Sequence, residues 1–253
     1  MKIATWNVNG IRARHAEIQE LLATEQPDVV CLQEIKASAD QVPELLVSPD
    51  GYWCYWHGGR GYSGVAILVR RGFTASTPTF SHPSFDREQR VVVAEIGTSR
   101  IASIYVPNGG KDYDAKLVFL EALGEWSSGA VSSGPLVICG DLNVAREERD
   151  VHPKERKPNQ IGTRPEERAL LERLIDRGLV DVGRTLDPDN DNLFTWWAPW
   201  RNLRQRNIGW RIDYVLATEA LAASASSAVS MREFGTSDHA PLVVECGDLP
   251  ADV

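Results

Sequence analysis

The chain of 253 residues carries 35 acidic and 27 basic residues, a formal net charge of −8, and a hydrophobic fraction of 43%. This composition excludes a disordered chain and argues against a protein that coats nucleic acid by bulk attraction, although carboxylates that hold a divalent cation would give a nuclease the same charge. The sequence contains no apolar run near the roughly 18 residues of a membrane span, no signal-peptide pattern and no C-x-x-C pair among its four cysteines, so we expect reduced cysteines and a cytoplasmic protein without membrane contact.

Helix-like and strand-like segments alternate in the first half of the chain. Apolar residues recur at helical spacing over Ile11–Leu22, and Pro27 ends that helix ahead of a strand over Val29–Leu32. Two further apolar runs, Gly64–Arg70 and Val91–Ile96, predict strands. The first half therefore predicts an α/β chain.

The second half continues this alternation around one long loop. A helix is predicted over Lys116–Trp126, and Thr163–Glu166 resembles a capping box ahead of an apolar helical stripe over Leu170–Ile175. Ala145–Gly162 is polar and aperiodic, and so long a loop within a domain is usually functional or disordered. Because no shift of composition marks a boundary, we expect one domain over residues 1–253. Strands that are apolar on both faces need cover on both, so two packed β-sheets flanked by helices are predicted.

Six short apolar runs begin or end on a carboxylate, an amide, a phenol or an imidazole. The runs are Met1–Asn7, Asp28–Glu34, Ile101–Asn108, Pro135–Asn143, Gly209–Leu216 and Ser237–Cys246. The polar residues at their ends are Asn7, Asn9, Glu34, Tyr105, Asn108, Asp141, Asn143, Asp213, Asp238 and His239. An unpaired polar group in a core costs about 1–3 kcal/mol, whereas strand ends that meet at one rim of a sheet can hydrate such groups together. The pattern predicts one site with the chemistry of a metal-dependent phosphodiesterase.

Strand geometry decides which of these side chains can act together. Residues i and i+2 of a strand point to one side, so Asp141 and Asn143 can face one site, whereas the neighbours Asp238 and His239 are not expected to be partners. His239 then needs another carboxylate to fix its tautomer, and Asp213 is the best candidate. Asp141 could activate water, while Asn143 and protonated His239 could bind phosphate oxygens.

The residue types also select a metal. The sequence shows no cluster of cysteine and histidine, so no zinc site is expected, and carboxylate and amide oxygens suit Mg²⁺ or Mn²⁺. Glu34 with Asn7 or Asp238 would suffice as ligands. The histidines outside the six runs are predicted to be ordinary hydrogen-bonding residues: His15, His57, His82 and His152.

Aromatic and basic residues are interleaved near the C-terminal third. Four of the eight tryptophans lie close together, at positions 196, 197, 200 and 210. The arginines among them are Arg201, Arg204, Arg206 and Arg211. The tryptophans fit either a plain core or a nucleic-acid surface, and the arginines favour the surface, where they would contact phosphates.

These residues resemble the exonuclease III family of AP endonucleases, within the DNase I-like phosphodiesterase superfamily. The matching stretches are Trp6–Gly10, Leu32–Glu34, Tyr105–Gly109, Gly140–Asn143, Arg206–Tyr214 and Ser237–Pro241. They occur in the family's order and span nearly the whole chain. The run Gly-Trp-Arg-Ile-Asp-Tyr is highly specific, whereas Ser-Asp-His marks only the superfamily.

The resemblance implies a four-layer α/β sandwich and Mg²⁺-dependent cleavage of duplex DNA on the 5′ side of an abasic site, with Mn²⁺ as a possible substitute. Family members often add 3′→5′ exonuclease and 3′-end-cleaning activities. The expected substrate is therefore double-stranded DNA with abasic or 3′-blocked sites, and the expected state is a monomer.

The resemblance also implies roles by matching position. The implied metal ligands are Glu34, Asn7 and Asp238. Asp141 would activate water or the leaving group, Asn143 and His239 would bind phosphate, Asp213 would orient His239, and Tyr105 would support the transition state. The residues expected to contact phosphate or DNA are Asn108, Lys111, Arg201, Arg204 and Arg206.

Trp196, Trp210 and Ile212 match the family's pocket for a flipped sugar, which selects abasic sites by size. Strand parity places Trp210 and Ile212 on one side and Asp213 on the other, so a local bend is required. Some close relatives have an arginine that enters the DNA helix where this chain has Lys111. They also have an aspartate near the metal where this chain has Asn9.

Two alternatives stay open from the sequence. The chain could be a general DNase, or an RNA or lipid-headgroup phosphodiesterase of the same superfamily, although the long loop and the tryptophan pocket favour DNA repair. It could also be a non-catalytic, nucleic-acid-binding relative, which would predict loss of the metal and base positions. All of those positions are present here.

Overall fold

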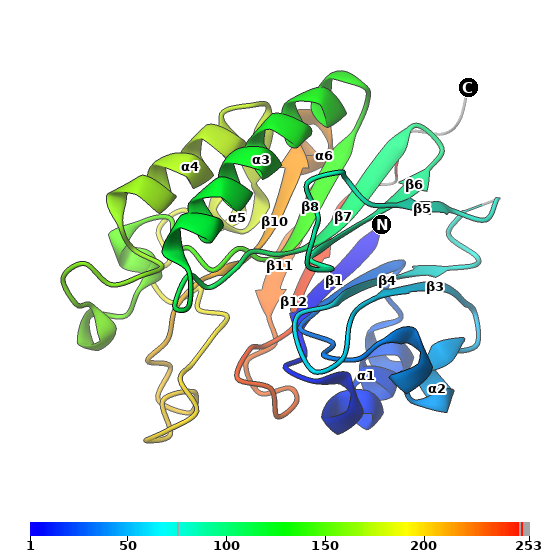
Figure 1. Ribbon diagram of the computed structural model, residues 1–253, viewed down its shortest axis with the longest axis horizontal. Helices are drawn as coiled ribbons and strands as arrows, with labels where there is room; N and C mark the ends of the chain where they lie inside the picture. Colours follow the sequence, from blue (N-terminus) through cyan, green and yellow to red (C-terminus); the bar gives the residue numbers. More distant parts are fainter. Residues whose placement is uncertain (75, 248, 250–253) are drawn as a thin grey trace.

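Two mixed six-stranded sheets form the centre of the computed structural model, which describes residues 1–74, 76–247 and 249 (Figure 1). The first sheet contains, in spatial order, β11 (Ser227–Ser230), β12 (Leu242–Glu245), β1 (Lys2–Asn7), β2 (Val29–Gln33), β4 (Val65–Arg70) and β3 (Tyr52–His57). The second contains β5 (Thr79–Ser81), β6 (Val91–Ile96), β7 (Ser99–Tyr105), β8 (Leu136–Asp141), β10 (Asp213–Thr218) and β9 (Leu179–Asp181). β1 and β2 are parallel, as are β7 and β8, while the other paired strands are antiparallel.

Helices cover the outer face of each sheet, which gives four layers (Figure 1). α1 (Ile11–Glu25) and α2 (Glu44–Val47) pack on the first sheet, and α3 (Tyr113–Ser132) and α4 (Pro165–Ile175) pack on the second. Short helices α5 (Val182–Leu186) and α6 (Glu219–Ala223) follow β9 and β10 directly, and single 3-10 turns lie at Ala39–Gln41, Glu148–Asp150 and Pro153–Glu155. The predicted fold class, a four-layer α/β sandwich, is confirmed. Within the described residues no helix is long and apolar enough to cross a membrane.

The alternation of side chains along β2 explains why the strand is apolar throughout. Val29 and Cys31 face the core between the two sheets, whereas Val30 and Leu32 face the layer of α1. Full burial of each such valine or leucine side chain stabilises the fold by about 1.5–3 kcal/mol. The strand is therefore specified by two cores at once.

The predicted helix ends differ from the observed ones in two places. α3 begins earlier than predicted, because the Asp112 carboxylate accepts the N–H of Ala115 at 2.9 Å, and it continues through Ser132. The predicted capping box at Thr163 is displaced by one residue, since the Glu167 carboxylate accepts the N–H of Arg164 at 3.0 Å. Strong capping partners, rather than helix propensity, decide where α3 and α4 begin.

The strand ends that carry polar residues meet at one rim. Asn7 ends β1 opposite Gln33 of β2, while Tyr105 ends β7 opposite Asp141 of β8. Asp213 begins the antiparallel strand β10 directly opposite Asp141. The fold thus places residues far apart in sequence around one opening between the two sheets.

Candidate active site

A cavity of about 340 Å³ lies at this rim. Its lining comes from both sheets and from the loops that follow their strands: Glu34, Tyr105, Asn108, Gly110, Asp141, Asn143, Gln160, Ile161, Gly162, Trp196, Trp210, Ile212, Asp238 and His239. Most of the residues predicted from the six apolar runs are therefore brought together. Asn7 and Asp213 lie behind this lining and contact it through hydrogen bonds.

Asn7 joins the two sheets at the centre of the site. Its amide nitrogen donates to Glu34 Oε1 and to Asp141 Oδ2, both at 2.9 Å. Its amide oxygen accepts the N–H of Asn9 at 3.0 Å, which fixes the orientation of the amide. One accepted hydrogen bond leaves the second lone pair of this oxygen free, so the role of Asn7 as a metal ligand remains a prediction. The amide nitrogen of Asn7 holds the two carboxylates in place.

Asp141 is held from a second direction by the residue two positions later. The backbone N–H of Asn143 donates to Asp141 Oδ1 at 2.9 Å, and the Asn143 amide donates to Asp141 Oδ2 at 3.1 Å. Asn143 lies beyond the end of β8 with φ 52°, so the two side chains meet through a turn rather than through strand parity. Gly140 permits this approach of β8 to β7, because a Cβ there would lie 1.9 Å from the carbonyl oxygen of Ile104.

His239 is fixed by contacts to both sheets. The Trp6 indole donates to the carbonyl of His239 at 3.0 Å, and the hydroxyl of the nearby Ser237 donates to the carbonyl of Asn7 at 2.7 Å. Asp213 is the carboxylate that contacts the ring, with Oδ2 2.9 Å from Nδ1. The opposite ring nitrogen, Nε2, lies 3.8 Å from Asp141 Oδ2. This imidazole can therefore carry a proton between a buried partner and the cavity.

The charges of these groups set their protonation. Burial alone would lower the pKa of His239, but the charges of Asp213 and Asp141 outweigh it and raise the pKa to about 10. Burial raises the pKa of Asp141, the His239 cation opposes this, and Asp213 and Glu34 add to the rise, so that the pKa is about 7. At neutral pH the ring of His239 is thus an imidazolium. It lies beside the carboxyl group of Asp141, whose pKa is close to that pH.

Glu34 offers the most direct place for a cation. Ligand atoms of Glu34, Asp141 and His239 all lie within 4.8 Å of one another, a grouping that could hold a metal ion. Lys36 contacts the same carboxylate, with Nζ 2.7 Å from Glu34 Oε2. Burial would raise the pKa of Glu34, but hydrogen bonds from Asn7 and Lys36 lower it on balance. Glu34 is therefore anionic and faces the cavity.

Asp238 lies on the opposite wall, outside this grouping. Its two oxygens accept hydrogen bonds from the Asn9 amide at 2.8 Å and from the Trp196 indole at 2.9 Å. Burial would raise the pKa of Asp238, but the charge of His239 and these hydrogen bonds lower it. The predicted role of Asp238 as a metal ligand remains a prediction, since these two hydrogen bonds leave lone pairs free on both oxygens.

Tyr105 closes the side of the cavity formed by β7. The Arg90 guanidinium lies 4.8 Å from the centre of its ring, and Arg90 also donates to the carbonyl of Tyr105 at 3.4 Å. Burial, followed by the charges of Glu34 and Asp141, raises the pKa of the Tyr105 phenol. Tyr105 is therefore a neutral hydroxyl able to donate a hydrogen bond into the cavity.

The predicted aromatic pocket forms one end of the cavity. The rings of Trp196 and Trp210 pack edge to face, with centroids 6.0 Å apart at 89°. Gly162 closes against them, and a Cβ there would come within 2.9 Å of Trp210, in a backbone conformation with φ +92°. The Trp210 indole N–H is buried and has no hydrogen-bond partner among the described residues. Together with Ile212, these groups make a narrow, largely apolar recess beside His239.

The remaining tryptophans of the sequence cluster lie elsewhere. Trp197 is core, only 1% exposed, and Trp200 is 58% exposed on the surface. Trp197 thus fits the core alternative, whereas the nucleic-acid surface at Trp200 remains a prediction.

The bend required by strand parity lies just before β10. β10 begins only at Asp213, so the predicted strand over Gly209–Leu216 is wrong for its first four residues. The Thr195 hydroxyl accepts the N–H of Ile212 at 3.2 Å and that of Asp213 at 3.1 Å. This turn lets Trp210 and Ile212 line the pocket while Asp213 contacts His239.

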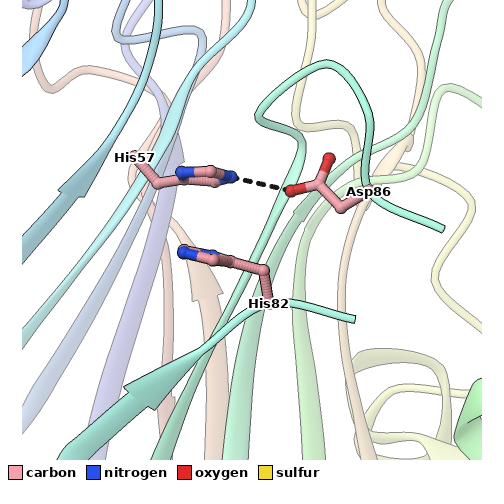
Figure 2. Close-up of side chains that lie close together, drawn as sticks. All are labelled: His57, His82 and Asp86. Atoms are coloured by element: carbon pink, nitrogen blue, oxygen red, sulfur yellow. Dashed lines mark hydrogen bonds and ion pairs between the residues drawn. The ribbon is translucent and has the colours of Figure 1, made fainter. Parts of the chain in front are cut away.

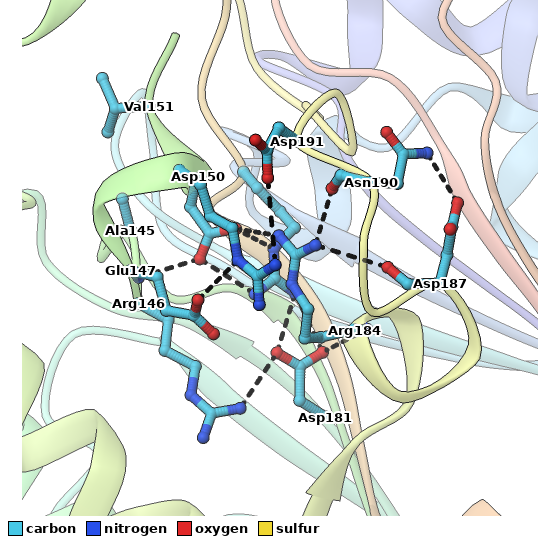
Figure 3. Close-up of polar contacts among 12 residues, drawn as sticks. Ala145, Arg146, Glu147, Asp150, Val151, Asp181, Arg184, Asp187, Asn190 and Asp191 are labelled. Atoms are coloured by element: carbon cyan, nitrogen blue, oxygen red, sulfur yellow. Dashed lines mark hydrogen bonds and ion pairs between the residues drawn. The ribbon is translucent and has the colours of Figure 1, made fainter. Parts of the chain in front are cut away.

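A buried ionic network anchors the same bend (Figure 3). Arg211, 4% exposed, donates to both oxygens of Asp150, at 2.8 and 3.0 Å, and to both oxygens of Asp181, at 2.8 and 2.9 Å. Arg184 donates to Asp150 as well, at 2.7 Å. Because Asp150 lies within the loop 145–162, the network ties that loop to β9, α5 and the start of β10. The long loop is thus part of the site wall, and Arg211 is a structural residue instead of the phosphate contact expected from sequence.

Replacing Arg211 by methionine is expected to lower the free energy of unfolding by about 3–5 kcal/mol, because Asp150 and Asp181 would lose a buried partner. Arg206→Met, which alters an exposed arginine of the same stretch, is the control and should change stability by less than about 0.5 kcal/mol. Chemical denaturation of the two variants measures the difference. Equal stabilities would show that the network contributes little.

The other predicted DNA contacts divide into exposed and committed side chains. Arg201, Arg206 and Lys111 are exposed, and Asn108 is exposed at the edge of the cavity. Arg204 instead donates to three backbone carbonyls of the loop 232–237 and lies over the Trp197 ring. Its guanidinium is occupied, so the prediction that Arg204 binds phosphate is corrected.

A second buried ion pair supports the turn that joins Asp141 and Asn143. This pair was not predicted from the sequence. Lys116 of α3 and Glu167 of α4 form an ion pair in which both side chains are fully buried. Lys116 also donates to the carbonyl of Asn143 at 2.7 Å, and Glu167 accepts the N–H of Gly162 at 2.6 Å. The only sequence signal was a lysine at a position that the helical stripe of α3 places inward. The contact of Lys36 with Glu34 was also not predicted, although Lys36 lies only two residues after Glu34.

The match to known proteins follows this geometry. A family model described as "Endonuclease/Exonuclease/phosphatase family" matches residues 4–239. The chain belongs to this family. It is similar to an exodeoxyribonuclease of Bacillus subtilis, 33% identical, with 96% of this chain and 98% of that protein covered.

Two solved structures share the whole fold. The 3′ phosphatase NExo from Neisseria, bound to a product DNA hairpin, has a TM-score of 0.89 and 32% identity, with 98% of this chain and 99% of that chain covered. An AP endonuclease from Archaeoglobus fulgidus has a TM-score of 0.87 and 30% identity, with 97% and 99% covered. The predicted resemblance to the exonuclease III and AP endonuclease group is confirmed, and so is the prediction of a phosphodiester-hydrolysing nuclease.

Proposed function

We propose that this protein is an AP endonuclease that cleaves duplex DNA on the 5′ side of abasic sites and also removes nucleotides and blocking groups from 3′ ends. One observation carries the proposal: the Asp213–His239 pair, Asp141 and Glu34 share a single cavity with the Trp196–Trp210 recess. A hydrolytic centre thus directly adjoins a pocket of limited size. A monomeric state and a cytoplasmic location remain predictions from the sequence.

The charges around the cavity fit a divalent cation. Four carboxylates, those of Glu34, Asp141, Asp213 and Asp238, stand against the two cations Lys36 and His239. Glu34 would hold the ion with Asn7 or Asp238, and hard oxygen ligands favour Mg²⁺, with Mn²⁺ as a substitute. When bound, the ion would supply positive charge that stabilises the phosphate in the transition state.

The protein's own groups would divide the remaining work. Ionised Asp141, held by Asn7 and Asn143, would accept a proton from the attacking water. Protonated His239, oriented by Asp213, would hold a phosphate oxygen and relieve its charge. The neutral hydroxyl of Tyr105 would donate a further hydrogen bond to the phosphate.

The recess would select the damaged nucleotide. Flipping a nucleotide out of the duplex costs least where no base is stacked, and a recess closed by Gly162 and Ile212 would admit a bare sugar more readily than a full nucleotide. The unpartnered Trp210 N–H would gain a hydrogen-bond partner on the sugar or phosphate. The exposed Arg201, Arg206 and Lys111 would contact the DNA backbone, so binding should weaken as salt rises.

A duplex with one abasic analogue tests the proposal. Incubation with Mg²⁺ should cut only the damaged strand, on the 5′ side of the analogue, and leave a 3′-hydroxyl that a polymerase extends. Chelator should abolish the cut, and an undamaged duplex should lose nucleotides only from its 3′ ends. Cutting at many undamaged internal positions would instead favour a general DNase.

The Glu34→Ala variant tests the metal assignment. Loss of this ligand should raise the Mg²⁺ concentration needed for half-maximal rate by at least about tenfold. Glu44→Ala, which alters an exposed glutamate on α2, is the control. An unchanged metal titration for Glu34→Ala would place the ion elsewhere.

The Trp210→Ala variant tests the recess. The ratio of cleavage at abasic sites to cleavage of intact duplex should fall by about 10- to 100-fold, because the wall that limits size is removed. Trp200→Ala, an exposed tryptophan outside the recess, should leave the ratio unchanged. Thermal unfolding of both variants, measured in parallel, separates loss of selectivity from loss of fold.

A further inference from the structure

Three potential metal ligands gather outside the active-site cavity. They are His57, His82 and Asp86, which we call the edge cluster, and their ligand atoms all lie within 4.8 Å of one another. His57 is the last residue of β3, and His82 directly follows β5. β3 is an edge strand of the first sheet and β5 is an edge strand of the second. The edge cluster therefore spans the open edge between the two sheets.

The side chains already contact one another (Figure 2). His57 Nε2 lies 2.8 Å from Asp86 Oδ2, and the rings of His57 and His82 are stacked with centroids 3.8 Å apart at 19°. The Tyr55 hydroxyl lies 2.9 Å from His82 Nε2, which gives the cluster a fourth polar group. Two imidazoles, a carboxylate and a phenol thus meet where sequence predicted only ordinary histidines.

We propose that the edge cluster binds Zn²⁺ or a similar borderline transition-metal ion, at a site distinct from the catalytic one. Two nitrogen ligands and one oxygen ligand suit Zn²⁺, whereas Mg²⁺ prefers oxygen alone. The edge cluster would supply three ligands, and water or the Tyr55 hydroxyl would complete a tetrahedral site.

Binding would require a small and specific movement. Ligands at about 2.0–2.1 Å from Zn²⁺ in a tetrahedron lie about 3.3 Å apart, so the contact between His57 and Asp86 must open slightly. Stacked rings cannot both direct an in-plane lone pair at one ion, so His82 must turn out of the stack. His82 is exposed, so its ring can turn once its contact with the Tyr55 hydroxyl opens. The bound ion would then cross-link the edges of the sheets.

The cross-link would also reach the active-site wall. Asp86 Oδ1 accepts the N–H of Arg90 at 2.8 Å, and the Arg90 guanidinium lies over Tyr105. An ion at the edge cluster would therefore fix the turn that carries Arg90.

Metal titration of the stripped protein tests the proposal. Zn²⁺ is added in the presence of excess Mg²⁺ that occupies the catalytic site, and binding is followed by competition with a chromophoric chelator. We expect one equivalent bound at micromolar Zn²⁺, with a rise in the melting temperature. Replacing Zn²⁺ by Co²⁺ should give the visible absorption of a tetrahedral nitrogen–oxygen site.

His82→Ala should abolish this equivalent, the Co²⁺ absorption and the rise in melting temperature. Because His82 is exposed, the variant should fold normally, and His57→Ala provides a second ligand deletion. His15→Ala removes a histidine of α1 outside the edge cluster and should bind as the unaltered protein does. His239→Ala should retain the equivalent, which separates the edge cluster from the catalytic histidine.

Equal Zn²⁺ binding by the unaltered protein and by His82→Ala would overturn the proposal, and so would binding only at millimolar Zn²⁺. Chelator competition, Co²⁺ absorption and melting temperature do not depend on nuclease activity. The result is therefore independent of the proposed function.

Discussion

Asp141→Asn is expected to lower turnover on an abasic duplex by roughly 10²–10⁴-fold while the protein still binds that duplex. The asparagine keeps the size of the side chain but cannot accept a proton from water. It also removes a negative charge that raises the pKa of His239. Single-turnover cleavage with Mg²⁺ measures the rate, and fluorescence anisotropy of labelled duplex without Mg²⁺ measures binding.

The control for this variant is Asp176→Asn, which changes an exposed aspartate at the end of α4. It should leave both rate and binding unchanged. A rate for Asp141→Asn within a few fold of the unaltered protein would remove Asp141 from the chemistry. Loss of binding together with loss of rate would point to a role in holding the substrate.

His239→Gln is expected to lower turnover by a similar factor, roughly 10²–10⁴-fold, and to change its pH dependence. Activity needs Asp141 ionised and His239 protonated. The rate of the unaltered protein should therefore rise as pH passes about 7, where Asp141 loses its proton, and fall as pH passes about 10, where His239 does. A pH profile of kcat/KM records both limbs.

The variant should lose the alkaline fall, because glutamine does not titrate. His152→Gln, which changes a histidine of the loop 145–162, should keep the normal profile. If the alkaline fall persisted in His239→Gln, another group would carry that proton. Asp213→Asn is an independent test of the His239 assignment, since it should move the alkaline limb to lower pH.

Much of the fold followed from local pattern. The helical spacing before Pro27 predicted α1, and the apolar run Val91–Ile96 matched β6 at both ends. These elements carry their signal within a few residues, because a period of 3.6 or of 2 is a property of one segment. Ends were less predictable, as at α3, which Asp112 caps and which begins at Tyr113, three residues before the predicted start.

Much of the candidate site also followed from the sequence. Polar residues at the ends of apolar strands predicted a shared rim. Asp238 and His239 both precede β12 and both line the cavity, so strand parity does not apply to them, although His239 has Asp213 as its partner, as expected. Asp213 was predicted as the partner of His239 and is the carboxylate that contacts it. Parity also required a bend before Asp213, but could not show how Thr195 makes it.

The sequence by itself determined the types of the elements, the chemistry of the rim and the family. Only the tertiary structure decided which charged side chains are exposed and which are buried partners. Arg201 and Arg211 belong to one basic stretch, yet the first is exposed and the second is enclosed by Asp150 and Asp181. The physical reason is that a charge is buried only where a partner lies across the fold, and that partner is distant in sequence. The edge cluster has the same origin, because edges of two different sheets bring its members together.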